Sequence, residues 1–181
     1  MGGINTFRRA VFLDRDGVIN RAIVRDGKHY PPTSIVELKI LPGVHEALQK
    51  LHDAKYLLVV VTNQPDVARG TAKREDVELM NAFLLSELPI DDFKTCYHDS
   101  EDKCRCRKPL PGALLEAAQE HNIDLSKSFM VGDRWRDVEA GASAGCKTFF
   151  IDYRYAEQRP DAPDFIVASL LEAKKIILGE Y

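Results

Sequence analysis

The chain has 181 residues, 45% hydrophobic and 29% charged, which excludes a largely disordered polypeptide and predicts a single domain over residues 1–181. Its formal net charge of −3 lacks the basic excess typical of nucleic-acid binding. No apolar run approaches the roughly 20 residues of a membrane-spanning helix, and the first residues lack a secretory apolar core. We therefore expect a cytoplasmic monomer whose partner is a small molecule, neither nucleic acid nor membrane.

Short apolar stretches alternate with helical patterns along the chain. The expected strands are residues 10–14, 57–62, 95–98, 128–132 and 147–151. The expected helices are residues 44–54, 73–88, 112–121, 136–144 and 169–178. Residues 57–61 are continuously apolar, as in strands covered on both faces. This order predicts a three-layer, Rossmann-like α/β fold with a mainly parallel sheet.

Polar residues follow three of these strands, at the edge where parallel sheets bind ligands. They are Asp14 and Asp16, then Thr62 and Asn63, and then Asp133. Each group taken alone is explained equally well by a turn or a helix cap. Three such groups on one sheet indicate a shared site.

Clustered carboxylates repel one another unless a cation or protons neutralise them. Oxygen ligands suit Mg²⁺, which also neutralises an incoming phosphoryl group. Asp14 can then attack phosphorus, and Asp16 can exchange protons with the leaving oxygen and with water. Thr62 and Asn63 offer hydrogen-bond donors, and Lys108 offers a positive charge, for the phosphoryl oxygens.

Four short motifs carry a resemblance to a known family. They are LDRDGVIN at residues 13–20, VTNQ at 61–64, CRKP at 106–109 and VGD at 131–133. In this order they resemble the motifs of the haloacid-dehalogenase superfamily of phosphatases, over roughly residues 10–151. Within it, the chain is most similar to the small zinc-containing branch of heptose bisphosphate and histidinol-phosphate phosphatases.

The resemblance implies a role for each matching residue. Asp14 is implied as the nucleophile and Asp16 as the general acid and base. The implied magnesium ligands are the Asp14 carboxylate, the Asp16 backbone carbonyl and Asp133. The implied phosphate and substrate contacts are Thr62, Asn63, Arg107, Lys108 and Arg134. Asp137 is expected either to support the metal through water or to act as a charge at a helix start.

Three of the four cysteines lie close together with a histidine. Cys96 and His98 form one pair, and Cys104 and Cys106 form another. These are the ligand types of closed structural zinc sites, so we predict a structural zinc-binding loop over residues 96–106. Four protein ligands leave no position for a reacting water, so the zinc is expected to fix the loop before Arg107 and Lys108. Cys146 is expected to be a buried apolar side chain.

Neither long connection has room for a cap domain of at least ~50 residues. Residues 20–42 follow the first motif, and residues 63–107 lie between Thr62 and Lys108. We therefore expect small loops to shape the pocket. In residues 20–30, Arg25, Lys28 and His29 are either contacts for a second anionic group or ordinary exposed charges.

The resemblance implies Mg²⁺-dependent phosphomonoester hydrolysis through an aspartyl-phosphate. The first candidate reaction removes the 7-phosphate of D-glycero-D-manno-heptose 1,7-bisphosphate. Histidinol phosphate and other small sugar phosphates are alternative substrates, and a polynucleotide phosphatase is disfavoured by the acidic charge balance. A zinc-stabilised interaction module that only binds a cation is the non-enzymatic alternative.

Overall fold

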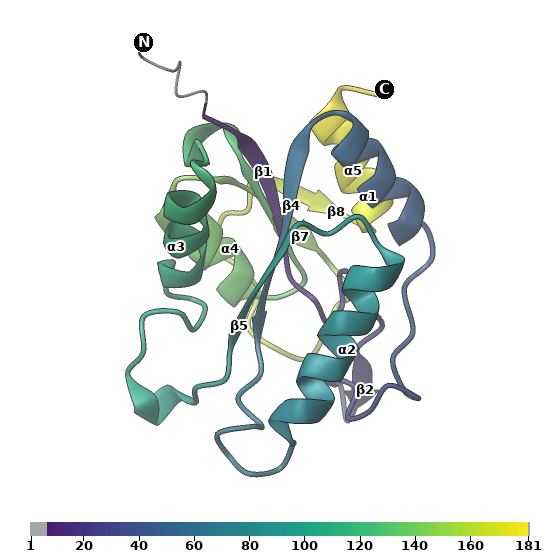
Figure 1. The fold of residues 1–181 in the computed structure, drawn as a ribbon, viewed down its shortest axis with the longest axis vertical. Helices are drawn as coiled ribbons and strands as arrows, with labels where there is room; N and C mark the ends of the chain where they lie inside the picture. Colours follow the sequence, from purple (N-terminus) through teal and green to yellow (C-terminus); the bar gives the residue numbers. More distant parts are fainter. Residues whose placement is uncertain (1–6, 181) are drawn as a thin grey trace.

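The computed structural model describes residues 7–180 and contains a six-stranded sheet whose neighbouring strands are all parallel (Figure 1). This confirms the predicted parallel sheet. In spatial order the strands are β5 (Asp92–Cys96), β4 (Tyr56–Asn63), β1 (Arg9–Leu13), β6 (Phe129–Gly132), β7 (Lys147–Ile151) and β8 (Phe165–Val167). The central strands are the apolar ones, because helices cover both of their faces.

Helices on both faces complete the three predicted layers (Figure 1). One face carries α1 (Val44–Asp53), α2 (Arg74–Glu87) and α5 (Leu170–Leu178), and the other carries α3 (Gly112–His121) and α4 (Trp135–Ala144). Short 3₁₀ turns cover Ser100–Asp102 and Leu125–Lys127. Each face has its own apolar core, and side chains alternate between the two cores along β1 and β4.

The helix ends follow local signals in the sequence. Ser169 caps α5 by accepting a hydrogen bond from the Glu172 backbone N–H, and Gly179 ends this helix in the left-handed conformation. Asn122 ends α3 in the same conformation. The five predicted helices consequently agree with the observed ones to within a residue or so at each end.

Four strands differ from expectation. The edge strand β5 begins at Asp92, before the expected residue 95, and its half-buried polar side chains hide the apolar signal. Strand β8 was not expected, because it has only three residues and exposes Ile166. An unexpected hairpin joins β2 (Ile23–Arg25) to β3 (Lys28–Tyr30) through Asp26 and Gly27, both with positive φ. Asp-Gly is a known signal for such a turn.

The connections are as short as the sequence suggests. In the described residues between β1 and α1, the β2–β3 hairpin is the only regular secondary structure. Between β4 and β5, helix α2 accounts for much of the chain. This agrees with the prediction that no large cap is present. Every helix in residues 7–180 is too short or too polar to cross a membrane.

The neighbouring leucines of α3 test the core assignment. Leu114 is fully buried, whereas Leu115 is 46% exposed. We expect Leu114→Ala to lower the free energy of unfolding by about 2–5 kcal/mol because it leaves a cavity, and Leu115→Ala to change it by less than about 0.5 kcal/mol. Urea denaturation followed by circular dichroism measures both, and equal losses would contradict this packing.

Candidate active site

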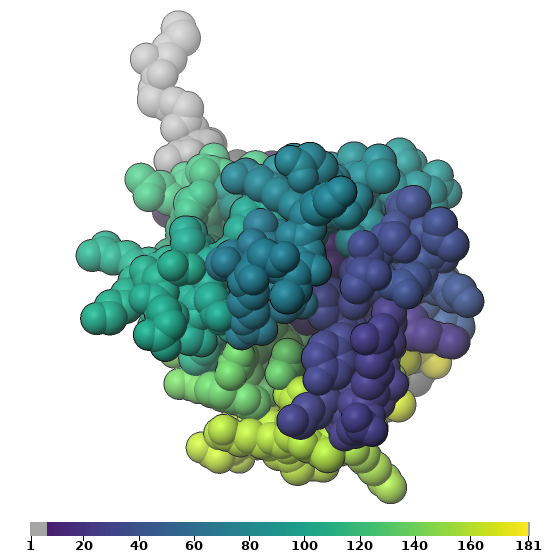
Figure 2. Space-filling view, turned by 90° about the horizontal axis from the view of Figure 1, so that it is seen from below, coloured from purple at the N-terminus to yellow at the C-terminus, as the bar shows by residue number. Residues whose placement is uncertain are grey.

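The strand register brings the predicted acidic residues to one edge of the sheet. Leu13 at the end of β1 pairs with Val60 of β4 on one side and with Val131 of β6 on the other. Asp14 and Asp133 follow directly on β1 and β6, so both emerge at the carboxyl edge. Figure 2 looks onto this edge, where the segments that follow β1, β4 and β7 surround the centre together with the 96–106 loop.

A buried lysine holds two of these carboxylates. Lys108 Nζ lies 2.7 Å from Asp14 Oδ1 and 2.6 Å from Asp137 Oδ1, and donates to the Val61 carbonyl at 2.6 Å. Burial alone would lower the pKa of Lys108, but the two carboxylates outweigh it and raise that pKa. Burial also raises the pKa of Asp14 to about 7, with Lys108 opposing and the other carboxylates adding to the effect. The lysine is a permanent cation here.

Asp133 has buried oxygens that lack a hydrogen-bond partner. Its carboxylate lies within 4.8 Å of those of Asp14 and Asp137. Asp137 is already occupied, because it binds Lys108 and accepts a hydrogen bond from the Arg134 backbone N–H at 3.0 Å. Asp14 and Asp133 therefore retain free oxygen ligands, and this donor set fits Mg²⁺.

Gly17 allows Asp133 to approach the chain after β1. A Cβ at this position, where φ is +97°, would lie 2.0 Å from Asp133 Oδ2. His29 approaches Asp133 from the hairpin, with Nδ1 3.1 Å from Oδ2. Burial lowers the pKa of His29, but the contact with Asp133 outweighs this and the pKa is raised. His29 is thus a buried neighbour of the carboxylates and differs from the exposed loop charge considered above.

Asp16 is held by three side chains. Its carboxylate accepts hydrogen bonds from Asn20 at 2.9 Å, from Gln64 at 2.8 Å and from two nitrogens of Arg15 at 3.1–3.2 Å. Burial raises the pKa of Asp16, but the Arg15 charge and the hydrogen bonds outweigh burial and lower it. The ionised form is favoured, which suits proton acceptance; donation requires the carboxyl group to take up a proton first.

The two polar residues at the end of β4 make different kinds of contact. The Asn63 side chain donates to the Lys108 carbonyl at 2.9 Å and accepts from the Lys108 backbone N–H at 3.1 Å. It therefore positions the lysine, where we had expected a donor for the phosphoryl group. Thr62 is buried and accepts from Gln64 at 2.9 Å, which leaves its own hydroxyl hydrogen free.

A cavity of about 260 Å³ opens above these residues. Asp14, Asp16 and Lys108 lie in its wall, as do Arg107 and Arg134. Arg107 donates to the His98 carbonyl at 3.1 Å, and Arg134 is paired with Glu157 at 2.6 Å. The structure thus brings the candidate nucleophile, its lysine and both candidate substrate arginines to one cavity.

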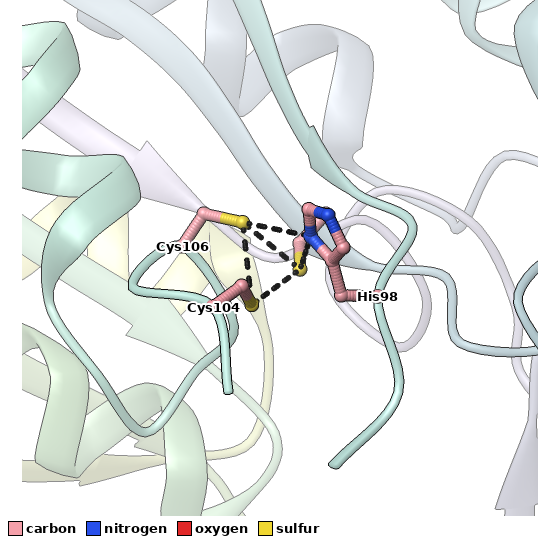
Figure 3. A group of neighbouring side chains, drawn as sticks. His98, Cys104 and Cys106 are labelled. Atoms are coloured by element: carbon pink, nitrogen blue, oxygen red, sulfur yellow. Dashed lines mark hydrogen bonds between the residues drawn. The ribbon is translucent and has the colours of Figure 1, made fainter. Parts of the chain in front are cut away.

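The side chains of the Cys/His cluster point toward one another (Figure 3). The cysteines are free, and the sulfur atoms of Cys96, Cys104 and Cys106 lie 3.1–3.7 Å apart. His98 Nδ1 lies 3.6 Å from the Cys96 sulfur and 3.4 Å from that of Cys106. A tetrahedron with zinc–sulfur bonds of about 2.3 Å separates its sulfur ligands by about 3.7 Å. The cluster can therefore bind zinc.

Four supporting residues had no assigned role in the sequence. Arg15 is fully buried and donates to Asn81 of α2 at 2.9 Å, while Asn20 and Gln64 bind Asp16. Asn81 lies among the buried apolar positions of α2, and a lone polar residue on such a helix face was the available signal. Arg15, Asn20 and Gln64 lie within the motifs, but only the structure shows that they hold the Asp16 carboxylate.

Removal of the lysine tests the electrostatics of this site. Lys108→Met leaves the Asp14 and Asp137 carboxylates buried without their cation, so we expect the free energy of unfolding in Mg²⁺-free buffer at pH 8 to fall by about 3–5 kcal/mol. The pKa of Asp14 is already raised by burial, so this carboxylate can regain neutrality by protonation and the loss should be smaller at pH 5.5. Urea titrations at the two pH values measure this, with the exposed Lys50→Met as the control. A pH-independent loss would contradict the assignment.

The amino-acid sequence is similar to those of known proteins. The haloacid dehalogenase-like hydrolase family matches residues 32–145. The D-glycero-β-D-manno-heptose-1,7-bisphosphate 7-phosphatase of Rhodopseudomonas palustris is 38% identical over 154 residues, covering 78% of this chain and 82% of the relative. Its Pasteurella multocida counterpart is 35% identical over 186 residues, covering 95% and 98%.

A solved structure shares the fold over almost the whole chain. The D,D-heptose 1,7-bisphosphate phosphatase from B. bronchiseptica, complexed with magnesium and phosphate, superposes with a TM-score of 0.79 at 28% identity. The alignment covers 96% of this chain and 99% of that one. By its sequence matches and its fold, the chain belongs to the haloacid dehalogenase-like hydrolases, in the phosphatase part of that family.

Proposed function

We propose that this protein is a Mg²⁺-dependent phosphatase that removes the 7-phosphate of D-glycero-D-manno-heptose 1,7-bisphosphate. The observation that carries the reaction is the buried Asp14 carboxylate, held by Lys108 beside the buried carboxylate of Asp133, with Asp14 in the wall of a cavity. A nucleophile, a fixed cation and free metal-ligand oxygens at one place suit phosphoryl transfer.

The reaction takes two displacements on phosphorus. An oxygen of Asp14 attacks the phosphorus atom, the bond to the sugar oxygen breaks, and that oxygen takes a proton from Asp16. Water then attacks the aspartyl-phosphate, Asp16 accepts its proton, and phosphate leaves Asp14 free. Lys108 and the Thr62 hydroxyl stabilise the charge on the transferred oxygens. Gln64 and Asn20 hold Asp16 in place during both steps.

The residues present fit a divalent cation. Asp14 and Asp133, with the Asp16 backbone carbonyl, would hold Mg²⁺, whose charge offsets the repulsion between carboxylate and phosphate when it is bound. The B. bronchiseptica relative was crystallised with magnesium and phosphate, which supports this proposal. Asp137 is assigned to Lys108 because both of its oxygens already have partners.

Zinc is proposed as a structural ion of Cys96, His98, Cys104 and Cys106. Cys106 directly precedes Arg107 and Lys108, so an ordered loop fixes the backbone position from which these two side chains extend. Arg107 also donates to the carbonyl of His98, which links the substrate arginine to the same cluster. Thiols that remain unpaired suit a reducing compartment, and we propose a cytoplasmic location on this ground.

The substrate is proposed from the named relatives, which are heptose-1,7-bisphosphate 7-phosphatases covering most of this chain. The decisive experiment compares kcat/KM for both anomers of D-glycero-D-manno-heptose 1,7-bisphosphate, for histidinol phosphate and for other sugar phosphates. We expect a heptose bisphosphate to exceed each other substrate by more than tenfold, and Asp14→Asn to abolish turnover. A tenfold preference for histidinol phosphate would refute this substrate, and an active Asp14→Asn would refute the nucleophile.

The zinc assignment has its own test. We expect Cys104→Ser to lower bound zinc, measured by elemental analysis, and to lower kcat/KM because the segment leading to Arg107 loses its anchor. Cys146→Ser is the matched control, because Cys146 is buried in the apolar core on the α3–α4 face and is not part of the Cys/His cluster. This variant should leave the zinc content unchanged. Retention of a full zinc equivalent by Cys104→Ser would remove this residue from the ligand set.

A further inference from the structure

Most cations in the cavity wall are already paired with acids. Arg134 is bound by Glu157 through two nitrogens, at 2.6 and 3.0 Å. Arg69 is bound by Asp99 through two nitrogens, at 2.7 and 2.8 Å. Lys108 lies between two aspartates. These three charges are largely neutralised before any substrate enters.

Arg136 is different. Among the arginines that line this cavity within residues 7–180, Arg136 alone has no carboxylate within 4.0 Å. Its buried Nε atom also has no hydrogen-bond acceptor. Its guanidinium lies 5.1 Å from the centre of the Trp135 ring, which supports the group without neutralising it. Burial, together with the nearby Arg134 and Arg107, lowers the pKa of Arg136. An unpaired, partly desolvated guanidinium is costly unless an anion arrives.

The location of Arg136 indicates where that anion belongs. A second cavity of about 210 Å³ adjoins the first and is lined by Trp135. Arg107, Lys108 and Arg136 line both cavities, so these three cations stand where the two hollows meet. A substrate whose reacting phosphate lies at Asp14 can therefore extend past Lys108 toward Arg136 and Arg107.

We propose that Arg136, acting with Arg107, binds the second phosphate of a sugar bisphosphate whose first phosphate lies at Asp14. This inference rests on the proposed function and adds to it a residue that determines substrate choice. The guanidinium presents a planar set of donors that suits two oxygens of one phosphate. Phosphate binding supplies the acceptor that the Nε atom lacks. Trp135 holds the arginine at the junction, so the preference for a bisphosphate is built into the start of α4.

Paired substrates test this assignment. We expect Arg136→Gln to lower kcat/KM for D-glycero-β-D-manno-heptose 1,7-bisphosphate at least tenfold, mainly by raising KM. The kcat/KM of this variant for heptose 7-phosphate should stay within about twofold of the wild-type value. Arg136→Lys should restore part of the kcat/KM lost for the bisphosphate. Arg9→Gln is the matched control, because Arg9 also stacks on an aromatic ring, 4.4 Å from the centre of Tyr56, at the opposite end of β1. Equal losses on both substrates, or none on either, would overturn the proposal.

A binding measurement separates this inference from the heptose assignment. Trp135 is the sole tryptophan of the chain, so its fluorescence reports on the second cavity. In an Asp14→Asn background, which prevents turnover, fructose 1,6-bisphosphate should change the fluorescence, and Arg136→Gln should raise its Kd at least tenfold. If heptose bisphosphate proves a poor substrate while this shift is seen, the proposed function fails and the role of Arg136 stands. An unchanged Kd overturns the role of Arg136 whatever the natural sugar is.

Discussion

The site depends on a single buried ammonium group between two carboxylates. Asp14, Asp133 and Asp137 have oxygens within 4.8 Å of one another, a density of negative charge that the fold cannot hold alone. Lys108 neutralises part of it through Asp14 and Asp137. It leaves the oxygens of Asp133 without a hydrogen-bond partner. The lysine therefore neutralises one part of the cluster, while the other part, Asp133, has the His29 ring nitrogen 3.1 Å from its Oδ2.

Two separate parts of the chain hold the backbone of this lysine in position. Asn63 of β4 forms two hydrogen bonds with its peptide groups, which ties the segment to the central sheet. The Cys/His cluster holds the chain just before it, through Cys106. A long side chain on an irregular segment would otherwise lose its geometry through many rotamers. The loop that carries the Cys/His cluster and the end of β4 thus both act on the segment of Lys108.

The sequence predicted the parts of the fold that follow from local pattern and left out those that depend on contacts between distant segments. Continuous apolar strands, the α3 helix and the four motifs were all visible in it. The role of Asn63 was not, because a hydrogen bond to a backbone 45 residues away has no local signal. For His29 the sequence left open a contact for a second anionic group or an exposed charge, and it did not predict a contact with Asp133, because only folding brings the two together. The Asp-Gly pair of the hairpin, by contrast, is a local turn signal that stands in the sequence itself.

The hairpin and the segment after β7 together do part of what a cap would do. Their backbones join where the Ala156 N–H donates to the Gly27 carbonyl at 3.0 Å, and the rings of His29 and Tyr155 lie 5.4 Å apart. This joint covers Asp133, which is 2% exposed. Arg107 and the start of α4 form another part of the cavity wall, which carries the unpaired charge of Arg136. A pocket that is covered near Asp133 by a backbone hydrogen bond and an aromatic contact, and lined elsewhere by an arginine without an acidic partner, can admit a long anionic substrate without moving a domain.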